Sequence, residues 1–164
     1  MAFTVWIDAD SCPAPVRKHV IAFSSKHAVP AVFVANRAIP LGAQGASVTM
    51  QVCEAAAQAA DDYIFAHCKQ HDAVITRDIP FAARLVERDI TVLNDRGTVF
   101  TKENIGERLS ERAFSLNLAE LGLGGGSKKS AYSPKAFKRF ADCFEREMQK
   151  LLIIDRYGEP RHGL

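Results

Sequence analysis

The sequence has no long apolar run and no strong excess of charge of one sign. None of its hydrophobic stretches approaches the roughly 20 residues that a membrane-spanning helix needs. Its first residues carry neither the basic nor the long apolar segment of a secretory signal. We therefore expect no membrane partner. The formal net charge of +2 is too small to identify a polyanionic partner by itself.

Paired cysteine motifs are missing as well. The four cysteines are widely scattered and contain no C-x-x-C; they are Cys12, Cys53, Cys68 and Cys143. Such cysteines are typical of reduced thiols in a cytoplasmic protein. With 164 residues, 48% of them hydrophobic and 24% charged, the chain has the composition of a soluble globular protein. That length fits one domain, with or without a small C-terminal appendage.

Short apolar segments alternate with helical patterns along most of the chain. The segments are rich in strand-forming residues and cover residues 3–9, 31–34, 48–52, 73–76 and 90–93. Helical patterns lie between and after them, at about residues 16–26, 54–70, 81–88 and 103–121. Repeated alternation with continuously apolar strands predicts an α/β fold, with a mostly parallel sheet and helices on both faces.

A Gly-rich segment separates this pattern from one last helix. Ser133 and Pro134 supply an N-cap and a proline for the first helical position, and apolar residues then recur at helical spacing. The expected organisation is an α/β domain over residues 1–121, a Gly/Ser/Lys linker over 122–134, a C-terminal amphipathic helix packing on the domain over 135–152, and a flexible tail over 153–164.

Aspartates follow several of the expected strands. Asp8 and Asp10 close the first strand, and the alternation of side chains places both on the same side of it. Asp78 follows the fourth strand. Because parallel strands with right-handed crossovers end at one edge, these three side chains can converge. Asp61 joins them only if the Ala-rich helix begins near that edge, which the sequence leaves open.

Two interpretations of these aspartates remain open. An aspartate after a strand is often a helix N-cap or a turn residue, as we expect for Asp95. Carboxylates clustered at the ligand-binding edge of a sheet, by contrast, repel one another unless some stay protonated or a cation lies between them. Oxygen ligands suit Mg²⁺ and Mn²⁺ and argue against zinc.

Several segments resemble the YaiI/YqxD family of bacterial proteins. They run in order over most of residues 3–150 and read Ile7-Asp8-Ala9-Asp10-Ser11-Cys12-Pro13, Val34-Ala35-Asn36, Ala60-Asp61, Val74-Ile75-Thr76-Arg77-Asp78-Ile79-Pro80-Phe81-Ala82, and Arg96-Gly97 followed by Thr101 and Asn104-Ile105. That family is largely uncharacterised. It is grouped by fold similarity with PIN-like and NYN-type nuclease domains, whose acidic residues at strand ends bind a divalent metal. The resemblance therefore implies a PIN-like fold and a metal-dependent nuclease.

The resemblance also implies a set of site residues. Asp8, Asp61 and Asp78 match the catalytic acids, and together with Asp10 they would hold Mg²⁺ or Mn²⁺. Such ions activate water and stabilise charge in phosphodiester hydrolysis. Residues expected to hydrogen-bond a ligand carboxylate or a phosphate oxygen are Ser11, Asn36 and Thr76. Basic residues expected to position the substrate, which the analogy indicates is RNA, are Arg37, Arg77, Arg96 and Lys102.

Three positions depart from the family pattern. Ala56 and Gln58 replace a Gly-x-Asp, so one possible ligand becomes a neutral amide. Asp95 stands where the family has proline and inherits no role. Residues 124–126 are Gly-Gly-Gly in place of Gly-Gly-Pro, which loosens the linker.

Two other functions compete with the nuclease interpretation. The sequence Asp8-Ala9-Asp10-Ser11 after an apolar strand partly resembles haloacid-dehalogenase-type phosphatases, with Asp8 as nucleophile. That fold also needs a later lysine and a late acidic pair, for which the chain offers no good match. The third possibility is a non-catalytic metal- or RNA-binding domain. The oligomeric state is not indicated by the sequence.

Overall fold

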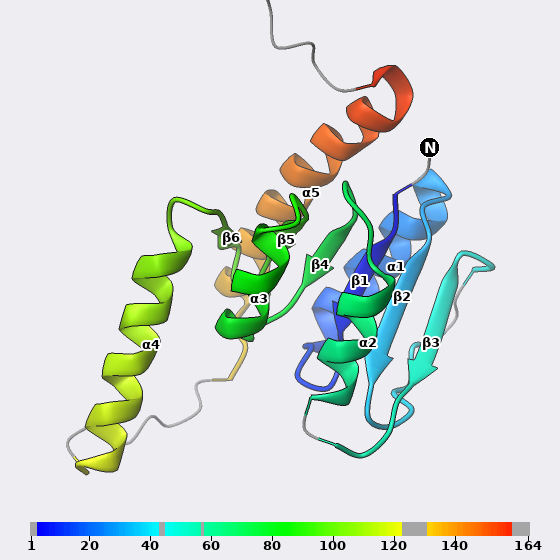
Figure 1. Ribbon diagram of the computed structural model, residues 1–164. Helices are drawn as coiled ribbons and strands as arrows, with labels where there is room; N and C mark the ends of the chain where they lie inside the picture. Colours follow the sequence, from blue (N-terminus) through cyan, green and yellow to red (C-terminus); the bar gives the residue numbers. More distant parts are fainter. Residues whose placement is uncertain (1–2, 43–44, 57, 123–130, 159–164) are drawn as a thin grey trace, which may run out of the picture.

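The computed structural model describes residues 3–42, 45–56, 58–122 and 131–158. Within these ranges the elements follow in the order β1 (Val5–Asp8), α1 (Ala14–His27), β2 (Ala31–Ala35), β3 (Val48–Val52), α2 (Ala59–His67), β4 (Ala73–Ile75), α3 (Ile79–Val86), β5 (Thr91–Leu93), β6 (Val99–Phe100), α4 (Ile105–Glu120) and α5 (Pro134–Tyr157). Figure 1 shows one sheet with helices on both of its faces. The predicted fold class, α/β with a mostly parallel sheet and a C-terminal helix, is confirmed.

The sheet has the strand order β3-β2-β1-β4-β5-β6. The first five strands are parallel, and β6 runs antiparallel to β5. β1 lies in the middle, with Val5–Asp8 paired to β2 and Val5–Ile7 paired to β4. The chain moves outward from β1 in one direction through β2 and in the other through β4. In open α/β sheets, ligands bind in the crevice where the strand order reverses in this way.

Each face of the sheet has its own apolar core. Val5 and Ile7 of β1 point into the core beneath α1 and α5, whereas Trp6 points into the core beneath α2 and α3. Because side chains alternate along a strand, Asp8 lies on the same face as Trp6. The last residue of the central strand therefore faces the helices that carry Asp61 and follow Asp78.

Helices α4 and α5 differ in how they are held. α5 begins at the N-cap Ser133, whose Oγ accepts a hydrogen bond from the backbone N–H of Ala136 at 3.0 Å. Its apolar stripe, including Phe140 and Phe144, is buried against α1. α4 packs against α3, and its only buried residue is Ile105. In Figure 1, α4 stands beside the sheet, beyond β6.

Two helix boundaries and one additional strand differ from the prediction. α2 begins at Ala59 rather than near residue 54, since the described residues between 54 and 58 are all exposed and have no apolar face to bury. α5 continues to Tyr157, so residues 153–157, expected in the tail, are helical. The two-residue strand β6 was not predicted. The Gly-rich run expected in the linker lies largely outside the described residues.

Two further observations concern the cysteines and the length and apolarity of the helices. All four cysteines are free. Among the helices in the described ranges, none combines the length and the apolarity that crossing a bilayer requires.

Candidate active site

A pocket of about 440 Å³ opens at the carboxyl edge of the sheet, beside the end of β1. All four aspartates expected to bind metal line it, and they come from three different parts of the chain. The residues that line the pocket are Asp8, Asp10, Ser11, Asn36, Ala60, Asp61, Arg77, Asp78 and Arg112. Asp61 reaches this pocket because α2 begins at the carboxyl edge and carries the aspartate in its first turn.

Thr76 connects two of these aspartates. Its hydroxyl donates a hydrogen bond to Oδ2 of Asp8 at 3.0 Å and accepts one from the backbone N–H of Asp78 at 3.1 Å. Thr76 is only 1% exposed, so the hydroxyl is fixed in place. Asp78 is also the N-cap of α3, with Oδ1 accepting from the N–H of Phe81 at 2.9 Å. Asp78 therefore caps α3 and also lines the carboxylate pocket.

Asp10 is held by the end of the neighbouring strand. Both of its carboxylate oxygens accept a hydrogen bond from the backbone N–H of Asn36, at 3.2 and 3.1 Å. The side-chain oxygen of Asn36 is buried and has no hydrogen-bond partner within the described chain. A buried acceptor without a donor costs free energy, so this oxygen is available to a ligand that supplies positive charge or a proton.

The electrostatics of the pocket are dominated by unbalanced negative charge. Burial, the nearby charges of Asp8 and Asp78 and a hydrogen bond to Asp78 together raise the pKa of Asp61 to about 7. Burial also raises the pKa of Asp8, the hydroxyl of Thr76 opposes this, and Asp10 and Asp78 add to it. The carboxyl groups thus cannot all ionise freely near neutral pH.

The donor set fits a hard divalent cation. The pocket offers carboxylate oxygens and the unpartnered amide oxygen of Asn36, which are the ligand types that Mg²⁺ and Mn²⁺ prefer. In the parts of the chain that the structure describes, no three His, Cys, Asp or Glu side chains already converge as a metal site. Side chains such as Asp61 would therefore have to close on the ion.

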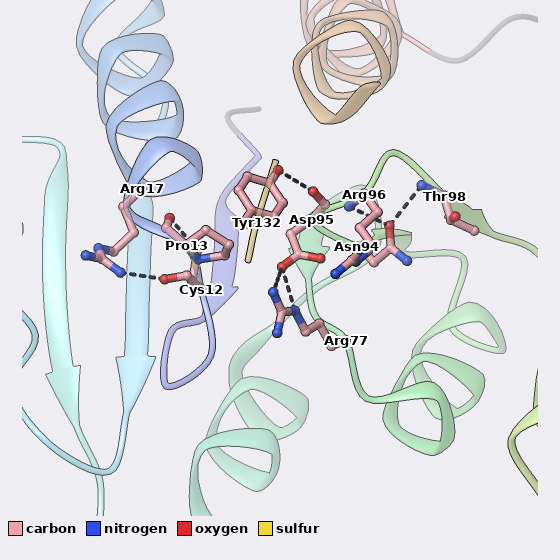
Figure 2. Close-up of polar contacts among 9 residues, drawn as sticks. All are labelled: Cys12, Pro13, Arg17, Arg77, Asn94, Asp95, Arg96, Thr98 and Tyr132. Carbon is pink, nitrogen blue, oxygen red and sulfur yellow. Dashed lines mark hydrogen bonds and ion pairs between the residues drawn. The ribbon is translucent and has the colours of Figure 1, made fainter. Parts of the chain in front are cut away.

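The basic residues expected to position a substrate are placed unequally. Arg77 lines the pocket, but its Nε and Nη2 both bind Oδ2 of the buried Asp95 at 2.5 Å, as Figure 2 shows. Arg96 is exposed on the turn after β5, and Arg37 is exposed directly after Asn36. Lys102 is not brought to the site. It pairs with Asp89, which precedes β5, at the amino edge of the sheet.

Arginines of α4 were missed by the sequence reasoning. Arg112 lines the carboxylate pocket, and Arg108 lies one turn earlier on the same helix. Nothing in the sequence marks them, because their place depends on how α4 packs against α3. Ser11 is exposed and lines the pocket, whereas Gln58, at the start of α2, is exposed and makes no capping hydrogen bond.

The Cys12 thiol is inert here, and the pocket lining bears on the phosphatase alternative. Burial raises the pKa of the Cys12 thiol to about 12, so it stays protonated and is not a nucleophile. No lysine is among the described residues that line the carboxylate pocket. The described lining therefore does not supply the lysine that the phosphatase interpretation places beside Asp8.

Comparisons with known proteins give one consistent result. Residues 6–150 match the model of a family described as an uncharacterized YaiI/YqxD family. A UPF0178 protein of Treponema pallidum is 44% identical over 160 residues, covering 98% of this chain and 89% of the relative. One from Psychromonas ingrahamii is 42% identical over 148 residues, covering 90% and 96%. No solved structure matches the chain.

Proposed function

The chain belongs to the YaiI/YqxD family, and we propose that it is a Mg²⁺- or Mn²⁺-dependent nuclease that hydrolyses RNA phosphodiester bonds. The observation that carries this proposal is the pocket lined by Asp8, Asp10, Asp61 and Asp78 at the switch point of the sheet. RNA as the substrate rests on the analogy with PIN-like and NYN-type domains. The free cysteines support a cytoplasmic location.

The residues of the pocket have distinct roles in this proposal. Asp8 and Asp78 are the principal ligands, because Thr76 and the first turn of α3 fix their side chains. Asp10 is oriented by the N–H of Asn36. Asp61 is the group that holds a proton near neutral pH and would release it as the cation binds.

The bound cation would supply the activated water and the charge stabilisation that phosphodiester hydrolysis needs. The chain's own contribution is a set of preoriented oxygen ligands and nearby arginines. Arg77 and Arg112 line the same pocket and would stabilise the negative charge of a phosphate. Arg37 and Arg96 are exposed close in sequence to pocket residues and would attract the polyanion.

Calorimetry with Mn²⁺ and Mg²⁺ tests the metal site directly. We expect the wild type to bind the ions and the double variant Asp8→Asn/Asp78→Asn not to bind them. Asp142→Asn removes an exposed carboxylate that pairs with Lys138 on α5, the helix that covers the other face of the sheet, and should bind metal normally. If the wild type binds neither ion, the aspartates are helix caps and turn residues and do not form a metal site.

Cleavage of single-stranded RNA on the same samples tests the activity. We expect Asp8→Asn to slow cleavage at least about 100-fold, and a chelator to stop it in the wild type. Metal binding without cleavage of any polynucleotide would favour the non-catalytic alternative. Trapping of beryllofluoride at Asp8, without cleavage of RNA, would favour the phosphatase instead.

A further inference from the structure

A second pocket lies beside the carboxylate site. It has a volume of about 470 Å³, within the range of roughly 300–1,000 Å³ that is typical of ligand sites. α4 forms one wall, and the turn between β5 and β6 forms the other. Four arginines line it, namely Arg77, Arg96, Arg108 and Arg112. We call this pocket the arginine groove.

The charge of the arginine groove is only partly neutralised from within. Its two acidic residues are Asp95, which binds Arg77, and Glu111, which lies 3.6 Å from Arg108. Within the described residues, Arg96 and Arg112 have no ion-pair partner. Two guanidinium groups are therefore free to bind an anion, and guanidinium geometry suits the oxygens of a phosphate.

The turn that forms one wall of the groove is rigidly built. The side-chain oxygen of Asn94 accepts hydrogen bonds from the N–H groups of Arg96 and Thr98, both at 2.9 Å. The hydroxyl of Tyr132 donates to the carbonyl of Asp95 at 2.5 Å, and Figure 2 shows how these contacts surround the turn. The backbone of Arg96 is thus fixed at the edge of the groove.

Gly97 anchors the same turn to the core helix α5. It has a φ of +83°, and a Cβ there would lie 2.6 Å from the carbonyl oxygen of Arg139. Only glycine fits this position without strain. The close approach couples the arginine-bearing turn to α5, whose apolar stripe is buried in the core.

The arginine groove is continuous with the carboxylate pocket. Arg77 and Arg112 line both. A phosphate chain that places one phosphate at Asp8 and Asp78 would therefore pass these two arginines as it enters the groove. Negative charge in one pocket and positive charge in the next suits a substrate with several phosphates, of which one is held through a cation and others are held by arginines.

We propose that the arginine groove binds the backbone of a single nucleic-acid strand next to the phosphate that is cleaved, with Arg96 and Arg112 making the contacts to its phosphates. This proposal rests on the proposed nuclease function, which places the cleaved phosphate of the strand at the carboxylate pocket. It adds two things to that function: a binding surface on α4, and a path for the substrate from the carboxylate edge toward β6.

Strand binding is measured in EDTA, so that neither metal binding nor cleavage contributes. The probe is a fluorescein-labelled oligouridylate, followed by fluorescence anisotropy at several salt concentrations. Arg96→Glu and Arg112→Glu change exposed side chains and should leave the fold intact, which circular dichroism checks. Arg156→Glu is the matched control, since Arg156 lies at the far end of α5 beside His27.

We expect each groove variant to weaken binding of the oligouridylate at least tenfold. Each should also lower the slope of log K against log salt by about 0.7, the value for one phosphate contact on a single strand. Arg156→Glu should bind like the wild type. Unchanged binding by both groove variants, equal weakening in the control, or no binding by the wild type would overturn the proposal.

Inorganic pyrophosphate distinguishes a strand from a small phosphate ligand. For a strand-binding groove, it should compete weakly at an equal concentration of phosphate. Complete displacement of the oligouridylate would instead identify a small-anion site and overturn the proposal.

The two proposals can fail separately. If Asp8→Asn abolishes cleavage while the groove variants bind the strand normally, the arginine groove is refuted and the nuclease stands. If the groove variants lose binding while no polynucleotide is ever cleaved, the groove stands and hydrolysis is refuted.

Discussion

Asp72 at the amino edge of the sheet and the aspartates of the carboxylate pocket at the carboxyl edge have opposite electrostatic surroundings. At the amino edge, Asp72 precedes β4 and is only 6% exposed. Its carboxylate accepts hydrogen bonds from the N–H of Thr4, the Nε1–H of Trp6 and the N–H of Lys69, each at 2.9 Å. Three donors converge on one charge, so this carboxylate ties β1 to the loop before β4.

At the carboxyl edge, the aspartates face one another. Asp8 accepts one hydrogen bond from Thr76, and Asp61 keeps its proton to a pKa of about 7 because burial and the other carboxylates disfavour its charge. A carboxylate surrounded by donors stabilises the fold, whereas carboxylates set against one another are destabilising until a cation or a proton balances them. The contrast distinguishes a structural aspartate from the pocket that we propose binds a cation.

Removing the structural aspartate should have the largest effect on stability. Asp72→Ala leaves one buried and two partly buried donors without an acceptor, and we expect the free energy of unfolding to fall by about 2–4 kcal/mol. Urea denaturation measures this loss. Asp62→Ala is the control, since Asp62 is exposed and lies 3.8 Å from Arg84, and it should change stability by less than about 0.5 kcal/mol. Equal stability of the two variants would contradict the structural role that we assign to Asp72.

Adding a cation should have the next largest effect on stability, and it should raise the free energy of unfolding. Mn²⁺ at about 100 times its Kd should raise the free energy of unfolding of the wild type by about 2.7 kcal/mol, because it binds the folded chain alone. Thermal denaturation with and without Mn²⁺ measures the gain. The gain should vanish in Asp8→Asn/Asp78→Asn and persist in Asp142→Asn. A similar gain in all three proteins would place the ion elsewhere.

Changing pH without metal should reveal how far the carboxylate pocket destabilises the fold. Asp61 has an ordinary pKa of 3.8 and a folded pKa of about 7. A pKa raised by folding gives stability that is fully present below about pH 4 and is lost as pH rises through about 7. Asp61→Asn removes this dependence, so the variant should gain stability relative to the wild type from pH 5 to pH 8. Urea denaturation across that range without metal tests it, and parallel pH profiles would contradict it.

Removing Lys102 should have the smallest effect. Its exposed ion pair with Asp89, at 3.3 Å, contributes at most about 1 kcal/mol. Because Lys102 lies at the amino edge, Lys102→Ala should cleave RNA at the wild-type rate, in contrast to Arg112→Ala. Slower cleavage by Lys102→Ala would show that the substrate reaches the opposite edge.

The position of Lys102 shows why the sequence does not predict the site residues correctly beyond β5. Up to that point the strands are parallel, and each is followed by a residue at the carboxyl edge. β6 is only two residues long and runs antiparallel, so it returns the chain to the amino edge and carries Lys102 with it. A strand this short has no detectable alternation, and the reversal could not be anticipated.

The same limit applies to Asp72 and Arg112. Asp72 precedes a strand rather than following one, and no local pattern shows that Thr4 and Trp6 donate to it. Arg112 belongs to a polar helix whose placement beside the pocket follows from its packing on α3. Both depend on contacts between residues that are distant in the chain.

The sequence by itself determined the α/β class, the parallel core and the convergence of Asp8, Asp10 and Asp78, because alternating apolar segments and strand-end positions are local properties. Only the tertiary structure decided that Asp61 joins them, that Arg77 is taken up by Asp95, and that α4 contributes Arg112. The physical reason is that charge balance depends on which side chains packing brings together. A residue's own sequence neighbours do not specify that.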